Sequence, residues 1–384
     1  MGKPRIALLG GGQLGRMFIE NALRYDADVS VLDPDPACSC ATLATRFTPG
    51  SFHDRDTVLR FAADADVVGI EIEHVSVEAL ERLEQQGKRV IPSSGTLRII
   101  QDKGLQKQFY RDHDIPTTDF ALIEDPEQIA QHSKLLPAFL KTRTGGYDGK
   151  GVMPIRSTAD IAKAFQGPCV LEQQADIAKE LAVIAVRALD GTMAAYDPVE
   201  MVFDPKLNLV DVLIAPAAVD ATVQQQAKAL ALRVAEAFGS PGILAVELFL
   251  TKDGRLLVNE TAPRAHNSGH HTIEACSSSQ YDQLLRAYMD WPLGSTTLRS
   301  PAAMINLIGE GGTGPTTLEG ASELLDTPDV FIHLYGKRET RNGRKMGHVT
   351  VLGATRADLE RSIGKVKQHL RIVPGAPLEA QPHN

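Results

Sequence analysis

The first 33 residues contain the pattern that most restricts the fold of this chain. An apolar run at 6–9 ends in G-G-G-Q-L-G, a segment with helical spacing follows, and V-S-V-L-D reads as a second strand. A strand, a helix and a strand in this order indicate a β-α-β unit. Further strands are expected at 66–72 and 89–91, on either side of a helix at 77–86. We therefore predict an α/β domain with a parallel sheet that ends near residue 95.

Two more domains are expected after it. Helical spacing covers 96–112, and a second α/β region then extends to about residue 293. Its hairpin turns, such as Asp190-Gly191 and Asp253-Gly254, favour antiparallel pairing. Strands at 302–308, 331–335 and 348–352 and a helix at 356–370 predict a small β-rich domain at the C-terminal end. The expected domains are therefore 1–95, 96–293 and 294–384.

Composition argues against several classes of protein. With 40 Lys and Arg against 48 Asp and Glu, the formal net charge is −8, whereas nucleic-acid and membrane-surface proteins usually carry a basic face. No apolar run approaches the ~20 residues of a membrane span, and no secretory cleavage pattern is present. The four cysteines form no Cys/His cluster. We expect a cytoplasmic protein that binds neither nucleic acid nor a membrane.

The glycine-rich segment L-K-T-R-T-G-G-Y-D-G-K-G at 140–151 is a candidate ligand loop. It gathers cationic side chains and accessible backbone N–H groups, an arrangement that suits a polyphosphate. Since V-M-P-I follows and reads as a strand, the loop is expected to join two strands and to close over a nucleotide. A glycine-rich hairpin with solvated charges is the alternative.

A second glycine cluster matches G-x-G-x-x-G at Gly10, Gly12 and Gly15, with Asp33 about 20 residues further on. Such a strand-to-helix turn can hold a dinucleotide, but it can equally hold the phosphate of a substrate, because the helix N-terminus supplies free N–H groups. A purely structural turn is the third possibility. The motif alone leaves these three readings open.

Two glutamates predict a metal site. If Asp253-Gly254 is a two-residue hairpin turn, Glu247 faces Glu260 across the strands, and both carboxylates share one face. Their repulsion makes a cation between them favourable, and hard carboxylate oxygens suit Mg²⁺. In a regular strand Asn259 points to the opposite face, so a ligand role for its side chain requires a bulge. The alternative is a surface hairpin with two solvated glutamates.

Donors for an anion follow directly after this hairpin. The segment T-A-P-R-A-H-N-S-G-H-H-T contains Arg264, His266, Asn267 and Ser268, and it indicates a small polar or anionic substrate beside the metal. A zinc site is less favoured because no cysteine accompanies the histidines. A second cationic group, at 341–348, could clamp a phosphate or could be a solvated turn.

Together these segments resemble the ATP-grasp enzymes, and within them the family of N5-carboxyaminoimidazole ribonucleotide synthetases. The resemblance covers nearly the whole chain and is carried by G-G-G-Q-L-G-R-M, K-T-R-T-G-G-Y-D-G-K-G, N-E-T-A-P-R-A-H-N-S-G-H and G-R-K-M-G-H. It implies an ATP-grasp fold, with an N-terminal Rossmann-like pre-ATP-grasp domain and a small C-terminal β-rich domain. It also implies a homodimer with ATP between two parts of the central domain.

The resemblance further implies specific site residues. ATP would contact Lys103, Lys141, Gly146, Tyr147, Asp148, Gly149, Lys150, Gly151, Val152, Glu172, Gln173, Gln174, Ala175, Glu180, Phe203, Asn259 and Glu260. The ribonucleotide would contact Gly12, Gln13, Leu14, Glu73, Tyr147, Asn267, Ser268, Lys337, Arg344 and Lys345. Catalytic roles fall to Tyr147, Asp148, Arg264, His266 and Lys345, and two Mg²⁺ ions to Glu247 and Glu260. Phe203 and His74 depart from the family, where His and Asn are usual.

The implied reaction is a carboxylation in purine biosynthesis. ATP and bicarbonate form carboxyphosphate, and the amine of aminoimidazole ribonucleotide captures its carboxyl group. The alternatives are a formate-dependent glycinamide ribonucleotide transformylase, an NAD-dependent dehydrogenase that uses the G-x-G-x-x-G turn, and a non-catalytic nucleotide sensor. The A-P-R-A-H-N-S-G-H and G-R-K-M-G-H segments favour the carboxylating branch.

Overall fold

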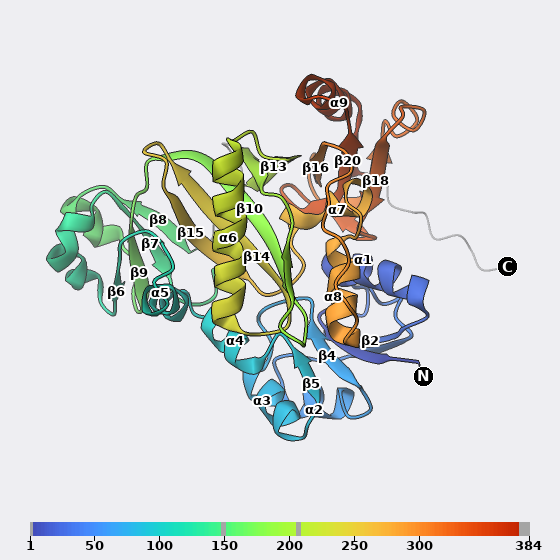
Figure 1. The fold of residues 1–384 in the computed structure, drawn as a ribbon, viewed down its shortest axis with the longest axis horizontal. Helices are drawn as coiled ribbons and strands as arrows, with labels where there is room; N and C mark the ends of the chain where they lie inside the picture. Colours follow the sequence, from blue (N-terminus) through green and yellow to red (C-terminus); the bar gives the residue numbers. More distant parts are fainter. Residues whose placement is uncertain (1–2, 147–150, 205–208, 376–384) are drawn as a thin grey trace.

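The computed structural model describes residues 3–146, 151–204 and 209–375. Within these residues the strands form sheets of five, four, nine and three strands. The five-stranded sheet occupies the N-terminal part of the chain, and the nine-stranded sheet runs through the middle of the molecule (Figure 1). None of the helices in the described ranges combines the length and apolar character needed to cross a bilayer.

The N-terminal sheet is parallel, as the β-α-β pattern predicts. Its order is β3-β2-β1-β4-β5, and every neighbouring pair is parallel. The strands are β1 (Arg5–Leu9), β2 (Asp28–Asp33), β3 (Arg46–Pro49), β4 (Val67–Ile70) and β5 (Arg89–Ile91). The helices are α1 (Gln13–Ala22), the 3-10 turn η1 (Leu23–Tyr25), α2 (Arg55–Phe61) and α3 (Val77–Gln85). Sequence patterns missed β3 and α2. β3 carries a weak signal because it is a short edge strand with no fully buried residue.

The helical segment expected at 96–112 is two helices, α4 (Ser94–Ile100) and α5 (Lys103–Asp112). Asp102 separates them, because its side chain accepts hydrogen bonds from the N–H groups of Gly104 (2.7 Å) and Leu105 (3.1 Å) and so caps α5. Asp102 also pairs with Arg143 at 2.7 Å. The start of α5 is thereby held beside the glycine-rich loop.

A four-stranded antiparallel sheet follows, in the order β6-β9-β7-β8. It contains β6 (Phe120–Ile123), β7 (Ala138–Thr142), β8 (Val152–Ile155) and β9 (Cys169–Gln173), with the 3-10 segments η2 (Pro126–Leu135) and η3 (Thr158–Lys163). The glycine-rich segment joins β7 to β8, which confirms that it connects two strands. Its central residues, Tyr147, Asp148, Gly149 and Lys150, lie outside the described residues.

The nine-stranded sheet has the order β15-β14-β10-β12-β13-β16-β20-β18, with β11 beside β10. Its strands are β10 (Ile177–Arg187), β11 (Met193–Ala195), β12 (Val199–Asp204), β13 (Leu209–Ala215), β14 (Gly242–Thr251), β15 (Leu256–Ala262), β16 (Ala302–Ile308), β18 (Val330–Leu334) and β20 (Lys345–Leu352). Its described pairs are antiparallel, as the hairpin turns predict. Three strands after residue 293, β16, β18 and β20, therefore extend the same sheet through the pairing of β13 with β16.

Helices cover this sheet and connect it to its neighbours. The long helix α6 (Ala221–Phe238) lies against β10 and β14 (Figure 1) and shares one apolar cluster with them. The helix α8 (Gln280–Met289) shares a second cluster with α1, β2 and β14, so it packs the N-terminal sheet against the central one. The short elements η4 (Asn267–Gly269) and α7 (Thr272–Ala275) lead into α8. This packing brings segments from both parts of the chain to one site.

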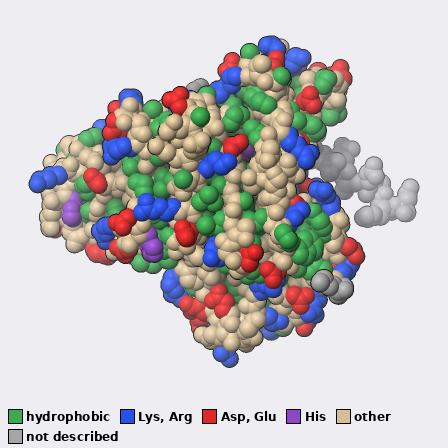
Figure 2. Space-filling view, viewed as in Figure 1, with side chains coloured by type: hydrophobic (Ala, Val, Ile, Leu, Met, Phe, Trp, Pro, Cys, Tyr) green, Lys and Arg blue, Asp and Glu red, His purple; other side chains and the backbone are tan. Residues whose placement is uncertain are grey.

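The C-terminal part completes the fold. The helix α9 (Arg356–His369) packs on β16 and β20, and a three-stranded sheet contains β17 (Gly314–Glu319), β19 (Glu339–Thr340) and β21 (Arg371–Pro374). Figure 2 shows acidic and basic side chains interspersed over one face of the molecule. Charge of a single sign does not dominate this face.

Candidate active site

The hairpin β14–β15 places Glu247 directly opposite Glu260, as expected, but the turn and the register of the strands differ from the prediction. The predicted two-residue turn is wrong: Thr251 pairs with Arg255, donating its N–H to the Arg255 carbonyl at 2.9 Å, so three residues form the turn. This turn shifts the register by one residue. A β-bulge at Asn259 inserts one extra residue and restores the register at the two glutamates.

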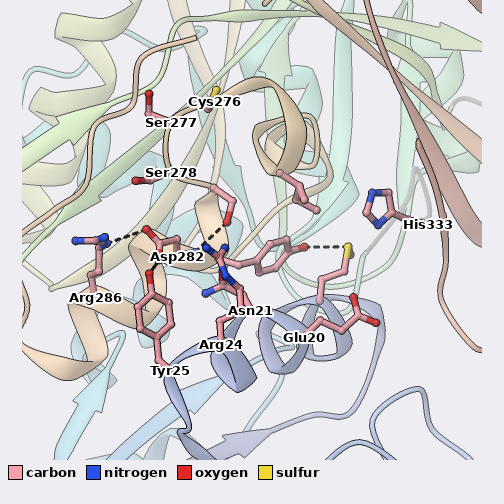
Figure 3. A pocket seen from close by; sticks show the side chains of 14 residues that line it. Glu20, Asn21, Arg24, Tyr25, Cys276, Ser277, Ser278, Asp282, Arg286 and His333 are labelled. Carbon is pink, nitrogen blue, oxygen red and sulfur yellow. Dashed lines mark hydrogen bonds and ion pairs between the residues drawn. The ribbon is translucent and has the colours of Figure 1, made fainter. Parts of the chain in front are cut away.

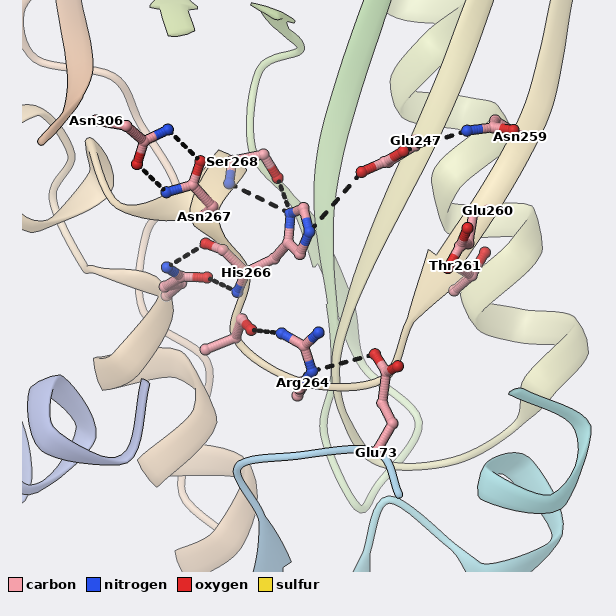
Figure 4. Close-up of polar contacts among 12 residues, drawn as sticks. Glu73, Glu247, Asn259, Glu260, Thr261, Arg264, His266, Asn267, Ser268 and Asn306 are labelled. Atoms are coloured by element: carbon pink, nitrogen blue, oxygen red, sulfur yellow. Dashed lines mark hydrogen bonds and ion pairs between the residues drawn. The ribbon is translucent and has the colours of Figure 1, made fainter. Parts of the chain in front are cut away.

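The bulge also decides where the Asn259 side chain lies. Its Nδ2 donates to Glu247 Oε2 at 3.2 Å, and its Oδ1 accepts from Lys141 Nζ at 3.3 Å. In a regular strand the amide would lie on the opposite face of the sheet. Asn259 therefore connects a carboxylate of the pair to the lysine that starts the glycine-rich loop, as Figure 4 shows for its contact with Glu247.

The two carboxylates have different charge environments. Burial, followed by the charges of Glu260 and Glu180, raises the pKa of Glu247 to about 7. Burial acts in the same direction on Glu260, but the ammonium groups of Lys103 and Lys141 outweigh it and lower the pKa of Glu260. Lys103 Nζ lies 3.0 Å from Glu260 Oε2. At pH 7 Glu260 is ionised and Glu247 is about half ionised, so the pair holds between one and two negative charges on one face of the hairpin.

This donor set fits a hard divalent cation. Facing carboxylate oxygens are preferred ligands of Mg²⁺, and a cation would relieve the repulsion that raises the pKa of Glu247. In the described ranges, no group of three or more His, Cys, Asp or Glu side chains is placed to hold a metal alone. A Mg²⁺ ion at the glutamate pair would take its remaining ligands from phosphate oxygens and water.

We expect Glu247→Gln to stabilise the metal-free protein at alkaline pH. The pKa of Glu247 is about 7 in the folded state against 4.5 ordinarily, so the folded state binds the proton more tightly. The free energy of unfolding therefore falls as pH rises from about 4.5 to 7 and then levels off. The variant lacks this loss, and its gain should be on the order of 2 kcal/mol at pH 8 and below about 1 kcal/mol at pH 5.

Urea unfolding of both proteins in EDTA at the two pH values measures this difference. Equal gains at pH 5 and pH 8 would contradict the assignment of the loss to ionisation of Glu247, because a packing effect of the amide has no reason to depend on pH.

Glu172 lies between two lysines, one of which is Lys141. Its carboxylate is 3.0 Å from Lys141 Nζ and 3.0 Å from Lys107 Nζ, and it accepts a hydrogen bond from Thr118 Oγ1 at 3.0 Å. Burial opposes ionisation, but the two lysines outweigh it and lower the pKa of Glu172 to about 2. The glutamate expected at the end of an apolar strand is therefore an ionised group between two cations.

The other residues expected at the nucleotide lie on β9, β10 and β12 and in the segment between β9 and β10. Gln173 ends β9, and the N–H groups of Gln173 and Gln174 donate to the carbonyls of Asp119 (2.8 Å) and Pro137 (2.9 Å). Ala175 follows before β10. Glu180 is partly buried on β10, and this burial raises its pKa. Phe203, on β12, packs against an apolar cluster of the central sheet.

The loop after β15 carries the anion donors toward the same carboxylates. Arg264 Nε lies 3.1 Å from Glu73 Oε1, which joins this loop to the N-terminal part of the chain (Figure 4). His266 Nε2 lies 3.8 Å from Glu247 Oε1, and His266 Nδ1 accepts from the N–H of Ser268 at 3.3 Å. Burial, then Arg264 and Lys345, lowers the pKa of His266 to about 3. His266 is therefore neutral, and its Nε2 carries the proton.

Two amide side chains that sequence patterns did not single out hold this loop in place. Gln280 accepts from the N–H of His266 and donates to the His266 carbonyl, both at 2.9 Å. Asn267 and Asn306 exchange two hydrogen bonds, of 2.8 and 3.1 Å. Gln280 is completely buried, and a polar residue on the buried face of a helix is the signal that could have identified it.

Carboxylates of the protein itself accept hydrogen bonds from the G-x-G-x-x-G turn, for which a substrate phosphate was one of three readings. The N–H of Gly11 donates to Asp33 Oδ2 at 2.7 Å, and the N–H of Leu14 donates to Glu71 Oε1 at 3.1 Å. A Cβ added to Gly12 would lie 2.5 Å from Glu71 Oε1. The protein's own carboxylates thus occupy donors that a phosphate would need, and these contacts favour a structural turn, also over a dinucleotide site.

Residues expected at the ribonucleotide come together beside this turn. Lys337 Nζ donates to Gln13 Oε1 at 2.8 Å, and it also donates to the carbonyl of Lys345. These contacts join α1 to the start of β20. The side chain of Arg344 instead donates to the Glu339 carbonyl at 2.6 Å. The side chains of Gln13 and Lys337 and the carbonyl of Lys345 therefore form one polar group between the N- and C-terminal parts of the chain.

A separate cavity of about 360 Å³ lies between α1, the segment 276–279, α8 and β18 (Figure 3). Its Asp282 accepts from Tyr25 Oη at 2.7 Å and pairs with Arg286 at 2.8 Å. None of the carboxylates or lysines described above lines it. We therefore place the candidate active site at the glutamate pair and not in this cavity.

Comparison with known proteins identifies the class and then the family. Residues 3–101 match the ribonucleotide synthetase preATP-grasp domain, residues 108–281 the ATP-grasp domain, and residues 302–362 the phosphoribosylaminoimidazole carboxylase C-terminal domain. With the sheets and the carboxylate pair described above, these matches define an ATP-grasp protein.

Solved structures and curated relatives give the family. N5-carboxyaminoimidazole ribonucleotide synthetase from Thermotoga maritima is 39% identical, with a TM-score of 0.90 over 97% of this chain and 100% of the other. The synthase of Bacillus subtilis is 35% identical over 90% of this chain and 91% of its own. The chain belongs to the N5-carboxyaminoimidazole ribonucleotide synthetase family.

Two further relatives add detail. The enzyme from Aspergillus clavatus, solved with ADP and 5-aminoimidazole ribonucleotide, is 34% identical with a TM-score of 0.85, over 95% of this chain and 97% of the other. Chloroplastic phosphoribosylaminoimidazole carboxylase of Vigna aconitifolia is 37% identical over 93% of this chain. The match spans 66% of the length of that plant protein.

Proposed function

We propose that this protein carboxylates 5-aminoimidazole ribonucleotide with bicarbonate at the expense of ATP, giving N5-carboxyaminoimidazole ribonucleotide, ADP and phosphate in purine biosynthesis. The observation that carries the proposal is the Glu247–Glu260 pair, with Lys103 and Lys141 on one side and His266 on the other. This arrangement provides charge for phosphoryl transfer and donors for a small anion in one place.

The nucleotide is proposed to lie beside Lys103, Lys141 and Glu180. Two ammonium groups near the carboxylate pair can neutralise phosphate oxygens, and phosphoryl transfer depends mainly on such neutralisation and on in-line positioning. The backbone at 172–175 is proposed to hold the adenine and Glu180 the ribose. The segment 146–152 is proposed to cover the phosphates.

Glu247 and Glu260 are proposed to hold two Mg²⁺ ions, with the Asn259 amide oriented beside them by Lys141. Bound Mg²⁺ supplies charge neutralisation at the β- and γ-phosphate oxygens. The Asn259 amide donates a hydrogen bond to Glu247 and so orients that carboxylate.

Arg264 and His266 are proposed to receive bicarbonate and then carboxyphosphate. A bicarbonate oxygen attacks the γ-phosphorus, the bond to the β-phosphate oxygen breaks, and ADP leaves. The amine nitrogen then attacks the carboxyl carbon, phosphate leaves, and the nitrogen gives up a proton. Because His266 is neutral with a proton on Nε2, it can donate a hydrogen bond to an anionic oxygen without repelling Arg264.

The ribonucleotide is proposed to lie where Gln13, Lys337 and Lys345 meet, with Leu14, Glu73, Arg344, Asn267 and Ser268 around it. Its phosphate would meet the cations of the C-terminal part and not the N–H groups that Asp33 and Glu71 occupy. Tyr147 and Asp148 remain proposed contacts outside the described residues. We also propose the division into 1–95, 96–293 and 294–384, a homodimer and a cytoplasmic location.

The test is release of ADP with each substrate omitted in turn. We expect ADP to form only when ATP, Mg²⁺, bicarbonate and aminoimidazole ribonucleotide are all present, because the γ-phosphoryl acceptor and the carboxyl acceptor are both required for turnover. ADP formation driven by formate and glycinamide ribonucleotide would instead identify the transformylase. Tight binding of NADH, measured by fluorescence, would favour a dehydrogenase.

A further inference from the structure

A buried lysine that has no assigned role lies behind the nucleotide side of the site. Lys107, on α5, is 2% exposed, and its ammonium has three partners. It donates to Thr117 Oγ1 at 2.7 Å and to Thr118 Oγ1 at 3.2 Å, and it lies 3.0 Å from Glu172 Oε2. An ammonium has three donors, so each of them is used. Complete pairing at such depth indicates a group with a defined structural or functional task.

The partners of Lys107 connect separate parts of the fold. Thr117 Oγ1 donates in turn to the Val258 carbonyl of β15 at 2.7 Å, and Thr118 Oγ1 donates to Glu172 Oε2 at 3.0 Å. Lys107 therefore fixes α5, the segment before β6, and β9 relative to the hairpin that carries Glu260. These are the elements between which a nucleotide would lie.

Glu172 divides its two oxygens between two lysines. Oε2 faces Lys107 and Thr118, whereas Oε1 faces Lys141 at 3.0 Å. Lys141 continues the chain of contacts to Asn259 Oδ1 at 3.3 Å, and Asn259 reaches Glu247. Since Lys107 takes up one oxygen, Lys141 meets only the other and keeps donors for further partners. Without Lys107, a buried carboxylate would have Lys141 as its one cation and would draw it inward.

We propose that Lys107 is a positioning residue of the nucleotide site, which acts through Glu172 to hold the Lys141 ammonium toward the nucleotide phosphates. The inference rests on the proposed function only in requiring a nucleotide at Lys141. Burial, partly offset by Glu172, lowers the pKa of Lys107 to about 8, so Lys107 is mainly protonated at neutral pH and can serve this role.

The test is a double-mutant cycle read out by calorimetric titration with ADP and Mg²⁺. Lys107→Met removes the charge and keeps most of the side-chain volume, and it should weaken ADP binding by about 10-fold or more, the size expected for a lost charged hydrogen bond. In a Glu172→Gln background the same change should alter the dissociation constant by less than about threefold, because the carboxylate through which Lys107 acts is absent.

Equal effects of Lys107→Met in the two backgrounds, or unchanged ADP binding in the single variant, would overturn the proposal. Two further variants distinguish the proposed positioning role of Lys107 from a general packing defect. Lys107→Gln keeps a donor for the threonines and should show the same non-additivity, and it replaces Lys107→Met in the cycle if that variant does not fold. Lys228→Met is the control. It removes a lysine of α6 that forms an ion pair of 2.8 Å with Asp197, and it should leave ADP affinity unchanged.

Turnover gives an independent readout. In Lys107→Met the KM for ATP should rise, whereas the KM for bicarbonate should stay within about twofold of wild type, since Arg264 and His266 do not contact Lys107 or Glu172. ADP binding does not require the reaction. A wild-type protein that binds ADP but carboxylates nothing would therefore count against the proposed function and leave the role of Lys107 intact.

Discussion

Glu260→Gln is expected to release ADP at least about 100-fold more slowly than the wild type at saturating substrates. The Gln side chain has the same shape but offers a neutral amide oxygen, whereas the proposed metal site requires a second carboxylate beside Glu247. The substitution also leaves Lys103, now 3.0 Å from the carboxylate, without its ionic partner. The expected loss is mainly in kcat, because charge at the transferring phosphoryl group is greatest in the transition state. A coupled ADP assay at several Mg²⁺ concentrations measures it.

The matched control is Asp253→Asn, which makes the same chemical change at the tip of the same hairpin. Asp253 pairs with Arg255 at 2.8 Å on an exposed turn, so turnover should stay within about twofold of wild type. Full activity of the Glu260→Gln protein would refute the metal assignment. A partial loss that higher Mg²⁺ restores would support it, since a weakened site can be filled by mass action.

Arg264→Met is expected to lower turnover by about 100-fold or more while leaving the dissociation constant of ADP within about twofold of wild type. The guanidinium lies beside Glu73, at the junction of the N-terminal part with the loop that carries His266. Its removal takes away the positive charge that would balance bicarbonate and carboxyphosphate, and it leaves Glu73 without its ionic partner there. The KM for bicarbonate should rise together with the fall in kcat.

Two measurements make this prediction specific. Arg299 is exposed, and its guanidinium donates to Ser277 Oγ at 3.1 Å among the contacts described, so Arg299→Met should retain turnover. If ADP affinity of the Arg264 variant falls as far as its turnover does, Arg264 acts on the nucleotide or on the fold, and the assignment to the carboxyl donor is wrong.

The hairpin of β14 and β15 illustrates how far sequence reasoning reaches. A two-residue turn at Asp253-Gly254 predicted that Glu247 lies opposite Glu260, and the two residues are paired in the structure. The predicted turn was one residue too short, and the bulge at Asn259 compensated for that difference. The pairing of the glutamates was therefore right although its derivation was not, and only the bulge explains why Asn259 lies on the same side as both carboxylates.

Lys107, Glu71 and Gln280 show what local patterns missed. Each is a polar side chain whose partner lies far away in the sequence or in another element. Glu71 belongs to none of the motifs, yet its carboxylate accepts a hydrogen bond from the Leu14 N–H in the first turn of α1, where a bound phosphate was one of the readings. A G-x-G-x-x-G turn looks the same in sequence whether its N–H groups are free or taken. The distinction depends on how β4 ends beside α1.

The amino-acid sequence by itself determined the order of the elements, the parallel N-terminal sheet, the antiparallel hairpins and the motifs of an ATP-grasp enzyme, because periodicity and turn residues act over a few neighbouring positions. The tertiary structure alone decided that His266 is partly buried and neutral, that Arg264 meets Glu73, and that Lys107 and Lys141 share Glu172. These contacts join residues from different sheets, and their charge states depend on burial and on neighbours that only the packing of those sheets brings together.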